Sequence, residues 1–165
     1  AVVTADQIIE PASILQKAIK DALLFVNQNT ECLITFGIKP TFPNTQLGYI
    51  KCINPTTFPD CKNRIYTVES FSEKPDEQTA RQYLETGQYF WNSGMFVWKA
   101  RTILRYLNQF LPETTGPLNK IKADWDGPNQ QETLEEYFPK LPKISIDFAV
   151  MEKAPDVYAI ELDCR

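Results

Sequence analysis

Residues 11–38 constrain the fold most, because their periodicity changes from helical to strand-like within a short distance. Pro11 suits the first turn of a helix, and apolar side chains then recur at helical spacing at Ile14, Leu15, Ala18, Ile19, Ala22, Leu23 and Val26. The apolar, β-branched run at 32–38 predicts a strand. Together with the strand-like start at 1–6, this pattern predicts a βαβ unit with parallel strands and a right-handed crossover.

The rest of the chain continues to alternate between strands and helices. Asp76 and Gly87 are suited to the N-cap and C-cap of one helix. The pattern predicts strands at 47–53, 64–71 and 157–162, a connection at 54–63, helices at 76–85, around 103–107 and from 145, and a mobile surface segment at 111–131. Repeats and linkers are absent from the sequence, so residues 1–165 are expected to form one α/β domain.

Composition excludes several classes of function. The chain has 165 residues, 43% of them apolar, which is enough for a substantial core. A formal net charge of -4 argues against binding nucleic acid through a basic surface. No apolar run approaches the roughly 20 residues that cross a bilayer, and no signal peptide precedes the first segment. These features predict a soluble, cytoplasmic protein that contacts neither nucleic acid nor membrane.

The cysteines and the lack of histidine restrict the chemistry further. Four cysteines, Cys32, Cys52, Cys61 and Cys164, form no CxxC pair, and the chain contains no histidine. This argues against a structural zinc site and excludes a histidine base within the chain. Cys32 and Cys52 lie in strand-like runs and are predicted to be buried thiols. A catalytic metal would need carboxylate and phosphate oxygens as ligands, which suits magnesium.

The run at 89–98 places the polar triplet Asn92, Ser93 and Gly94 inside an aromatic and apolar stretch. An amide and a hydroxyl can pair with sugar hydroxyls, aromatic faces can bound a pocket, and glycine permits close approach to the backbone. The alternative is a tight turn at 92–94 that leads into a strand at 95–98. Local sequence leaves both interpretations open.

Three other segments carry candidate chemistry, each with a structural alternative. Asp6 ends the first predicted strand, where it could bind magnesium or simply cap the next helix. Pro75 biases Lys74 toward an extended backbone that would direct its ammonium at a phosphate, and Glu73 can accept from hydroxyls; the alternative is a charged strand end. In 145–153, Asp147 and Glu152 could face a site or balance a helix dipole.

Taken together, these segments resemble the mannose-1-phosphate guanylyltransferases, the nucleotide-sugar pyrophosphorylases that make GDP-mannose. The matching stretches occur in the family's order at 4–9, 35–41, 48–50, 71–75, 91–96 and 145–153. The resemblance implies a Rossmann-like mixed, mainly parallel sheet of the nucleotide-diphospho-sugar transferase type. It also implies a reaction in which mannose 1-phosphate attacks the α-phosphate of GTP, with magnesium as cofactor and no covalent enzyme intermediate.

Carried over by position, the resemblance assigns site residues. Asp6 would bind magnesium, and Lys74 would meet the sugar phosphate; these two would be the catalytic residues. The substrate-binding residues would be Gly48, Tyr49, Glu73, Lys74, Asn92, Ser93, Gly94 and Asp147. Two places depart from the family pattern: Gln7 replaces a usual histidine, and Gln46-Leu47-Gly48-Tyr49 stands where the family often has Gly-Tyr-Gly-Tyr, so one glycine is lost.

The family's Gly-rich loop, which would hold the GTP phosphates, does not occur in this chain, and neither does its downstream Trp-Ser-Asp segment. The chain is therefore expected to be an internal fragment, inactive alone, whose exposed first strand would permit homo-oligomer formation. Two alternatives stay open: another sugar-1-phosphate nucleotidyltransferase with a different base or sugar, and a non-catalytic sugar-phosphate binding or regulatory module.

Overall fold

The computed structural model describes residues 1–5 and 7–164. The chain divides into two compact units, one formed by Ala1–Thr102 with Pro155–Arg165 and the other by Ile103–Ala154, and each is described by itself. Within the described residues no helix is long and apolar enough to cross a membrane. The single domain expected for 1–165 remains a prediction.

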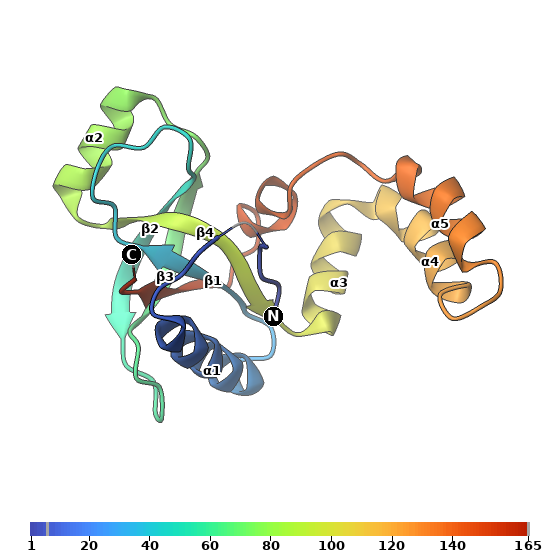
Figure 1. Cartoon of the computed structure of the whole chain (residues 1–165), viewed down its shortest axis with the longest axis horizontal. Coiled ribbons are helices and arrows are strands. Elements are labelled where there is room, and N and C mark those ends of the chain that lie inside the picture. Colours follow the sequence, from blue (N-terminus) through green and yellow to red (C-terminus); the bar gives the residue numbers. More distant parts are fainter. Residues whose placement is uncertain (6, 165) are drawn as a thin grey trace. The chain divides into compact units, whose positions relative to one another are not determined.

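Five strands form the sheet of the first unit (Figure 1): β1 (Leu33–Ile38), β2 (Tyr49–Thr56), β3 (Ile65–Ser72), β4 (Tyr89–Trp98) and β5 (Val157–Leu162). They pair in the order β1-β4-β2-β3-β5, and β5 closes the ring by pairing with β1. The β1–β5 pair is parallel, whereas β1–β4, β2–β3, β2–β4 and β3–β5 are antiparallel. The α/β class with a mixed sheet is confirmed, but the described strands are not mainly parallel.

The βαβ unit expected at the start of the chain is only partly formed, because its first strand is reduced to an isolated bridge. Val2 forms a single antiparallel bridge with Phe96 of β4, and β1 pairs with the same strand, also antiparallel. The first segment and β1 therefore run in the same direction with β4 between them. Val2 and Val3 are about half exposed, so this segment is not a buried strand. Sequence periodicity cannot reveal that a strand from a distant segment inserts between two others.

Helix α1 (Ala12–Gln28) covers one face of the strands, as its apolar spacing predicts (Figure 1). Its buried residues Ala18, Ala22, Phe25 and Val26 belong to the main core with side chains of β1, β4 and β5. On α1, Leu23 is 45% exposed, although the sequence places it on the buried face. The helix excludes water from the sheet face that it covers.

Helix α2 (Glu77–Thr86) has the predicted caps at both ends. Asp76 Oδ1 accepts a hydrogen bond from the Thr79 amide at 2.7 Å, and Gly87 follows with φ 65°. Since a left-handed residue ends the helix without a Cβ penalty, glycine suits that position. Ala80 of α2 packs with Tyr49 and Trp91. Helix α2 is thereby fixed beside β2 and β4.

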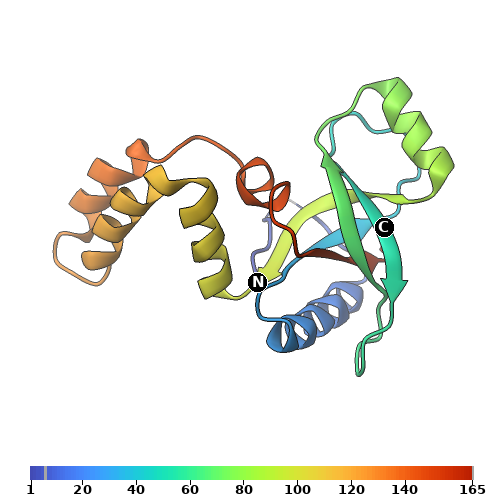
Figure 2. The same cartoon turned by 180° about the vertical axis from the view of Figure 1, so that it is seen from behind.

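The loop of the β2–β3 hairpin, residues 57–64, is held against α1 (Figure 2). Asp21 of α1 is 5% exposed, and its Oδ2 accepts hydrogen bonds from the Lys62 amide, the Asn63 amide and Asn63 Nδ2, at 2.8, 2.8 and 2.7 Å. A buried carboxylate is stable only when its lone pairs are satisfied, and these donors supply that. The predicted hairpin connection is confirmed, but its bounds shift from 54–63 to 57–64 because residues 54–56 belong to β2.

The second unit is helical. It contains most of α3 (Ala100–Phe110), then η1 (Pro112–Thr114), α4 (Thr115–Ala123), α5 (Gln130–Tyr137), η2 (Phe138–Lys140) and the π-helix η3 (Asp147–Met151). Most of the segment 111–131 is helical, and its predicted mobility stays a prediction. Its Pro, Gly and Asn residues lie in the first turns and the connection, while Leu118 and Ile121 occupy one face of α4 at helical spacing.

The two cysteines predicted to be buried thiols are confirmed as such. Cys32 and Cys52 are 3% and 5% exposed, and burial raises the pKa of each thiol to about 12. A thiol with such a pKa holds its proton at neutral pH and is a poor nucleophile. Neither residue is suited to catalysis.

Candidate functional site

The polar triplet of β4 forms a β-bulge. Thr35 of β1 pairs with Phe96 and Gly37 pairs with Asn92, so residues 93–95 of β4 lie opposite Phe36 alone. Gly94 has φ 68°, which glycine adopts without steric cost. The strand thus continues through the triplet, and the alternative of a tight turn before a strand at 95–98 is wrong. Bulges bend a strand and redirect its side chains, often beside a binding site.

Hydrogen bonds fix the bulge from inside. Asn92 Oδ1 accepts from Thr35 Oγ1 at 2.8 Å and from the Gly94 amide at 3.3 Å. The Met95 amide donates to Ser93 Oγ at 3.2 Å. Ser93 is buried, and its hydroxyl oxygen is the acceptor for a backbone amide. These bonds hold the Asn92 side chain in one orientation.

The N-terminal segment contacts the outer side of this bulge. Gln7 Nε2 donates to the Ser93 carbonyl at 2.7 Å. A Cβ built on Gly94 would lie 3.9 Å from Thr4 Cγ2. Gln7 therefore takes a structural role at a position where the resembling family usually has histidine. Asp6, the predicted magnesium ligand, lies outside the described residues.

Gly48, Glu73 and Asn92 form the centre of the candidate site. The Asn92 amide donates to the Gly48 carbonyl at 2.8 Å. A Cβ added to Gly48 would overlap Glu73 Oε2 and would lie 3.8 Å from the Asn92 Cβ. The Glu73 side chain is 28% exposed, so its carboxylate borders solvent. The absence of a side chain at Gly48 leaves the space that the Glu73 carboxylate occupies.

Lys74 stands at the edge of this cluster with an unusual backbone. Its Nζ lies 3.9 Å from Glu73 Oε1, and its side chain is 61% exposed. Its φ is 46°, in the left-handed region, so the extended backbone predicted from Pro75 is wrong. Residues held in sparsely populated backbone regions often mark functional sites, because the surrounding structure must enforce them.

The other predicted site residues fall in different places. The Tyr49 side chain is buried with Trp91 and Ala80, and its hydroxyl accepts from the Asn44 amide at 2.9 Å. Asp147 begins η3 and belongs to the second unit, whereas the cluster belongs to the first. The structure thus groups Gly48, Glu73, Lys74 and Asn92, whereas Tyr49 has a packing role.

A hollow of about 630 Å³ lies in the same unit at the carboxyl ends of β1 and β5. Ligands of open α/β sheets commonly bind at such strand ends. Sequence analysis missed this hollow, because segments distant in the chain line it: Gln7, Ile8, Ile9, Ile38, Lys39, Thr41, Leu47, Trp91 and Cys164. Trp91, which lines the hollow, directly precedes Asn92 on β4.

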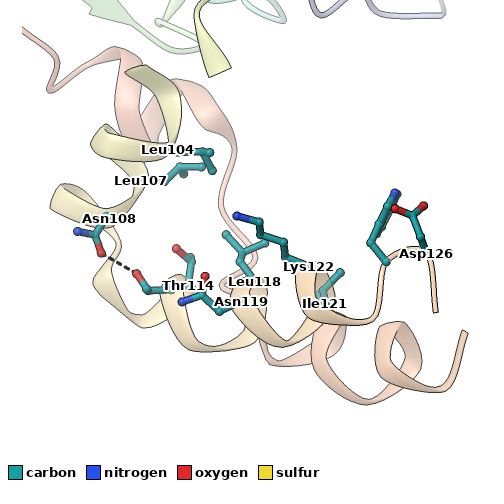
Figure 3. Close-up of a pocket in the computed structure, with 11 residues that line it drawn as sticks. Leu104, Leu107, Asn108, Thr114, Leu118, Asn119, Ile121, Lys122 and Asp126 are labelled. Carbon is teal, nitrogen blue, oxygen red and sulfur yellow. Dashed lines mark hydrogen bonds between the residues drawn. The ribbon is translucent and has the colours of Figure 1, made fainter. Parts of the chain in front are cut away.

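The second unit contains its own hollow of about 650 Å³ (Figure 3). Its lining includes the apolar side chains of Leu104, Leu107, Leu118 and Ile121 and the charged side chains of Lys122 and Asp126. Thr115 Oγ1 donates to Asn108 Oδ1 at 2.7 Å beside it. No sequence motif identified this hollow.

The described residues do not form a metal site by themselves. Across residues 1–5 and 7–164, no three carboxylate, thiolate or imidazole side chains gather closely enough to hold a metal ion. Glu73 is the carboxylate of the cluster, and Lys74 lies beside it. An ammonium beside a single carboxylate suits an anionic ligand better than a metal cation.

Comparisons with known proteins find a matching family and similar sequences. A profile described as nucleotidyl transferase matches residues 1–124. The xanthan biosynthesis protein XanB of Xanthomonas campestris pv. campestris (strain B100) is 37% identical over 166 residues, covering 98% of this chain and 33% of that protein. The mannose-1-phosphate guanylyltransferase of Klebsiella pneumoniae is 35% identical over 163 residues, covering 98% of this chain and 34% of that protein.

The fold is also similar to a solved structure. A crystal structure described as mannose-1-phosphate geranyltransferase from Thermus thermophilus superposes with a TM-score of 0.82 at 29% identity, covering 99% of this chain and 44% of that chain. The chain spans about a third of the length of the curated relatives named above.

Proposed function

Because this chain belongs to the nucleotidyl transferase family, we propose that it forms the sugar-phosphate side of an enzyme that makes GDP-mannose. In the proposed reaction, mannose 1-phosphate attacks the α-phosphate of GTP and pyrophosphate leaves. The observation that carries the proposal is the grouping of Gly48, Glu73 and Asn92 beside the exposed ammonium of Lys74. The curated relatives named above supply the identity of the sugar and the base.

Each residue of the cluster has a proposed task. The Glu73 carboxylate accepts hydrogen bonds from sugar hydroxyls, and Asn92 contacts the same sugar. The Lys74 ammonium pairs with the phosphate on the sugar, which holds the nucleophile in place and offsets its charge. Catalysis of this type depends on alignment and charge neutralisation and needs no histidine base. Tyr49, Ser93, Gly94 and Asp147 stay predicted site residues.

Magnesium is proposed as the metal, with Asp6 as a ligand. The described residues offer no complete metal site, so no step of the reaction is assigned to the ion. Asp6→Asn is the variant that tests the assignment: we expect a weaker apparent affinity for Mg²⁺ in titrations of the full-length protein. Gln7, the next residue in the sequence, donates to the Ser93 carbonyl in the β4 bulge, which supports the proposal.

We also propose that the mixed sheet is part of a Rossmann-like fold of the nucleotide-diphospho-sugar transferase type. The TM-score of 0.82 over 99% of the chain supports this relationship.

The proposed function is tested with the full-length gene product that contains these residues. We expect it to form GDP-mannose from GTP and mannose 1-phosphate, and Lys74→Ala to raise the KM for mannose 1-phosphate at least 10-fold more than the KM for GTP. Equal losses for both substrates would contradict the role of Lys74. Preference for ATP, CTP, UTP or glucose 1-phosphate would indicate a different nucleotidyltransferase, and binding without turnover would indicate a non-catalytic module.

The isolated 165-residue chain is a second test. Its six glycines form no Gly-rich phosphate loop, so we expect it to form no GDP-mannose. Turnover by this chain at about 1 per second, a rate common among enzymes, would refute that expectation.

A further inference from the structure

Thr35 is a fully buried polar residue in the middle of an apolar strand. Its exposed fraction is 0%, and Ile34 and Phe36 on either side belong to the core. Its Oγ1 lies 2.8 Å from Asn92 Oδ1 and 3.2 Å from the Met95 carbonyl oxygen. A hydroxyl carries one proton, and the shorter contact identifies Asn92 Oδ1 as its main acceptor. The register of β1 and β4 breaks directly after Thr35.

The orientation of the Asn92 amide follows from its two donors. The Gly94 amide can only donate, so the Asn92 atom that it meets at 3.3 Å must be the oxygen. Thr35 Oγ1 supplies a second donor to the same oxygen. An amide oxygen has two lone pairs, which these two donors use. A hydrogen bond from the Asn92 side chain to a ligand therefore comes from Nδ2, as a donor.

Glu73 has the complementary character. An ionised carboxylate only accepts hydrogen bonds, and both Glu73 Oε2 and the Asn92 Cβ lie around the vacant Cβ position of Gly48. A donor on Asn92 and an acceptor on Glu73 would together match a sugar hydroxyl, which accepts from the first and donates to the second. A rotated Asn92 amide would instead offer a second acceptor, and the single proton of that hydroxyl could not serve both acceptors.

We propose that Thr35 is a positioning residue, which fixes the Asn92 amide so that Asn92 donates to, and Glu73 accepts from, the hydroxyls of the bound sugar. This inference rests on the proposed function of the cluster as a sugar-phosphate site. Thr35 contacts no ligand itself and acts through Asn92. Its loss therefore weakens sugar binding and leaves nucleotide binding unchanged.

The test is a double-mutant cycle in the full-length protein, with Thr35→Val and Asn92→Ala alone and combined. Valine has the shape of threonine without the hydroxyl. We expect Thr35→Val to raise the KM for mannose 1-phosphate about 5- to 10-fold, the effect of one lost hydrogen bond, with the KM for GTP changed less than 2-fold. In the Asn92→Ala background, Thr35→Val should raise the KM no further. Thr35→Ser should restore a value near wild type.

The outcomes separate the two proposals. A wild-type protein without activity on mannose 1-phosphate refutes the proposed substrate, and the cycle is then measured with the sugar 1-phosphate that a panel of substrates identifies. An active wild type in which Thr35→Val and Asn92→Ala have independent, multiplicative effects refutes the positioning role. So does an equal rise in the KM for both substrates. If Thr35→Val does not fold, Thr35→Cys replaces it as the test variant. Its thiol is a weaker hydrogen-bond donor than the hydroxyl, so the KM for mannose 1-phosphate should lie between that of the wild type and that of Asn92→Ala.

Discussion

At the scale of single residues, Lys74 differs from its neighbours in its backbone as well as its charge. Its φ of 46° places an L side chain in a region that costs about 1–2 kcal/mol, directly before a buried proline. Pro75 is held in the protein interior, and Asp76 caps α2, so the chain on both sides of this turn is fixed. The backbone conformation that orients the Lys74 ammonium is therefore imposed by the packing of the flanking residues and not by the intrinsic φ preference of lysine.

The strain at Lys74 predicts a difference between two truncations. Both Lys74→Ala and Lys74→Gly remove the ammonium, but only glycine adopts φ 46° freely. After allowing for the greater entropy of unfolded glycine, we expect Lys74→Gly to be about 0.5–1 kcal/mol more stable than Lys74→Ala. Urea unfolding measures this difference. At Lys39, which has no positive φ, the same pair should show alanine as the more stable variant.

Gly48 makes a second residue-scale prediction. A Cβ there overlaps the end of the Glu73 side chain, which is flexible enough to move, so Gly48→Ala should displace the carboxylate at a stability cost below about 1 kcal/mol. We expect the KM for the sugar phosphate to rise about 10-fold, and initial-rate kinetics measure it. Gly116→Ala is the matched control, because a Cβ at Gly116 has no neighbour within 4 Å. An unchanged KM in Gly48→Ala would remove Gly48 from the site.

At the scale of elements, the contact between α1 and the β2–β3 hairpin shows how one carboxylate joins two segments about 40 residues apart. Asp21 is on the buried face of a helix that sequence periodicity identified correctly, but its partners at positions 62 and 63 are visible only in the folded chain. Its hydrogen bonds hold the loop that connects β2 to β3. Gly48 directly precedes β2, and Glu73 directly follows β3. By holding the loop at the other end of this hairpin, the Asp21 contact helps to fix the two strands that carry these site residues.

Asp21→Ala should accordingly destabilise the protein by about 2–3 kcal/mol, because two backbone amides lose a charged acceptor inside the structure. Chemical denaturation measures the loss, and hydrogen exchange should show the hairpin loop opening first. Lys20→Ala, at an exposed position of the same helix, is the control and should change stability by less than about 0.5 kcal/mol. Equal effects of the two variants would contradict the role of Asp21.

At the scale of the whole molecule, the stability of the first unit should depend on alkaline pH. Cys32 and Cys52 are buried, and burial raises the pKa of each thiol from 9.0 to about 12. Below pH 9 the thiols are protonated in the folded and unfolded chains. Between pH 9 and 12 only the unfolded chain loses these protons, so the free energy of unfolding falls as pH rises.

This alkaline loss is measured by urea unfolding at several pH values between about 8 and 11. We expect the variant with both Cys32→Ser and Cys52→Ser to show a smaller decline in stability across this range than the wild type. Tyrosines with raised pKa values, such as Tyr66 and Tyr158, contribute to the decline in both proteins, so the difference between the two curves isolates the thiols. Identical slopes would show that the thiols ionise in the folded chain.

The sequence by itself determined the local elements. The positions of α1, α2 and β5, the caps at Asp76 and Gly87, and the buried cysteines all follow from periodicity and residue type, which depend on neighbours a few positions away. The resemblance to a known family singled out Gly48, Glu73, Lys74 and Asn92 as a set. The description of the matching family agrees with that resemblance at the level of nucleotidyl transfer.

Only the tertiary structure decided how strands pair, because pairing joins segments whose separation no local pattern records. It placed β4 between the first segment and β1, closed the ring through β5, and made a bulge where sequence left a choice between a turn and a site. It also set Thr35 against Asn92, 57 positions away. A threonine in an apolar strand is an ordinary residue in sequence, and its buried hydroxyl acquires a role only when the fold supplies the acceptor.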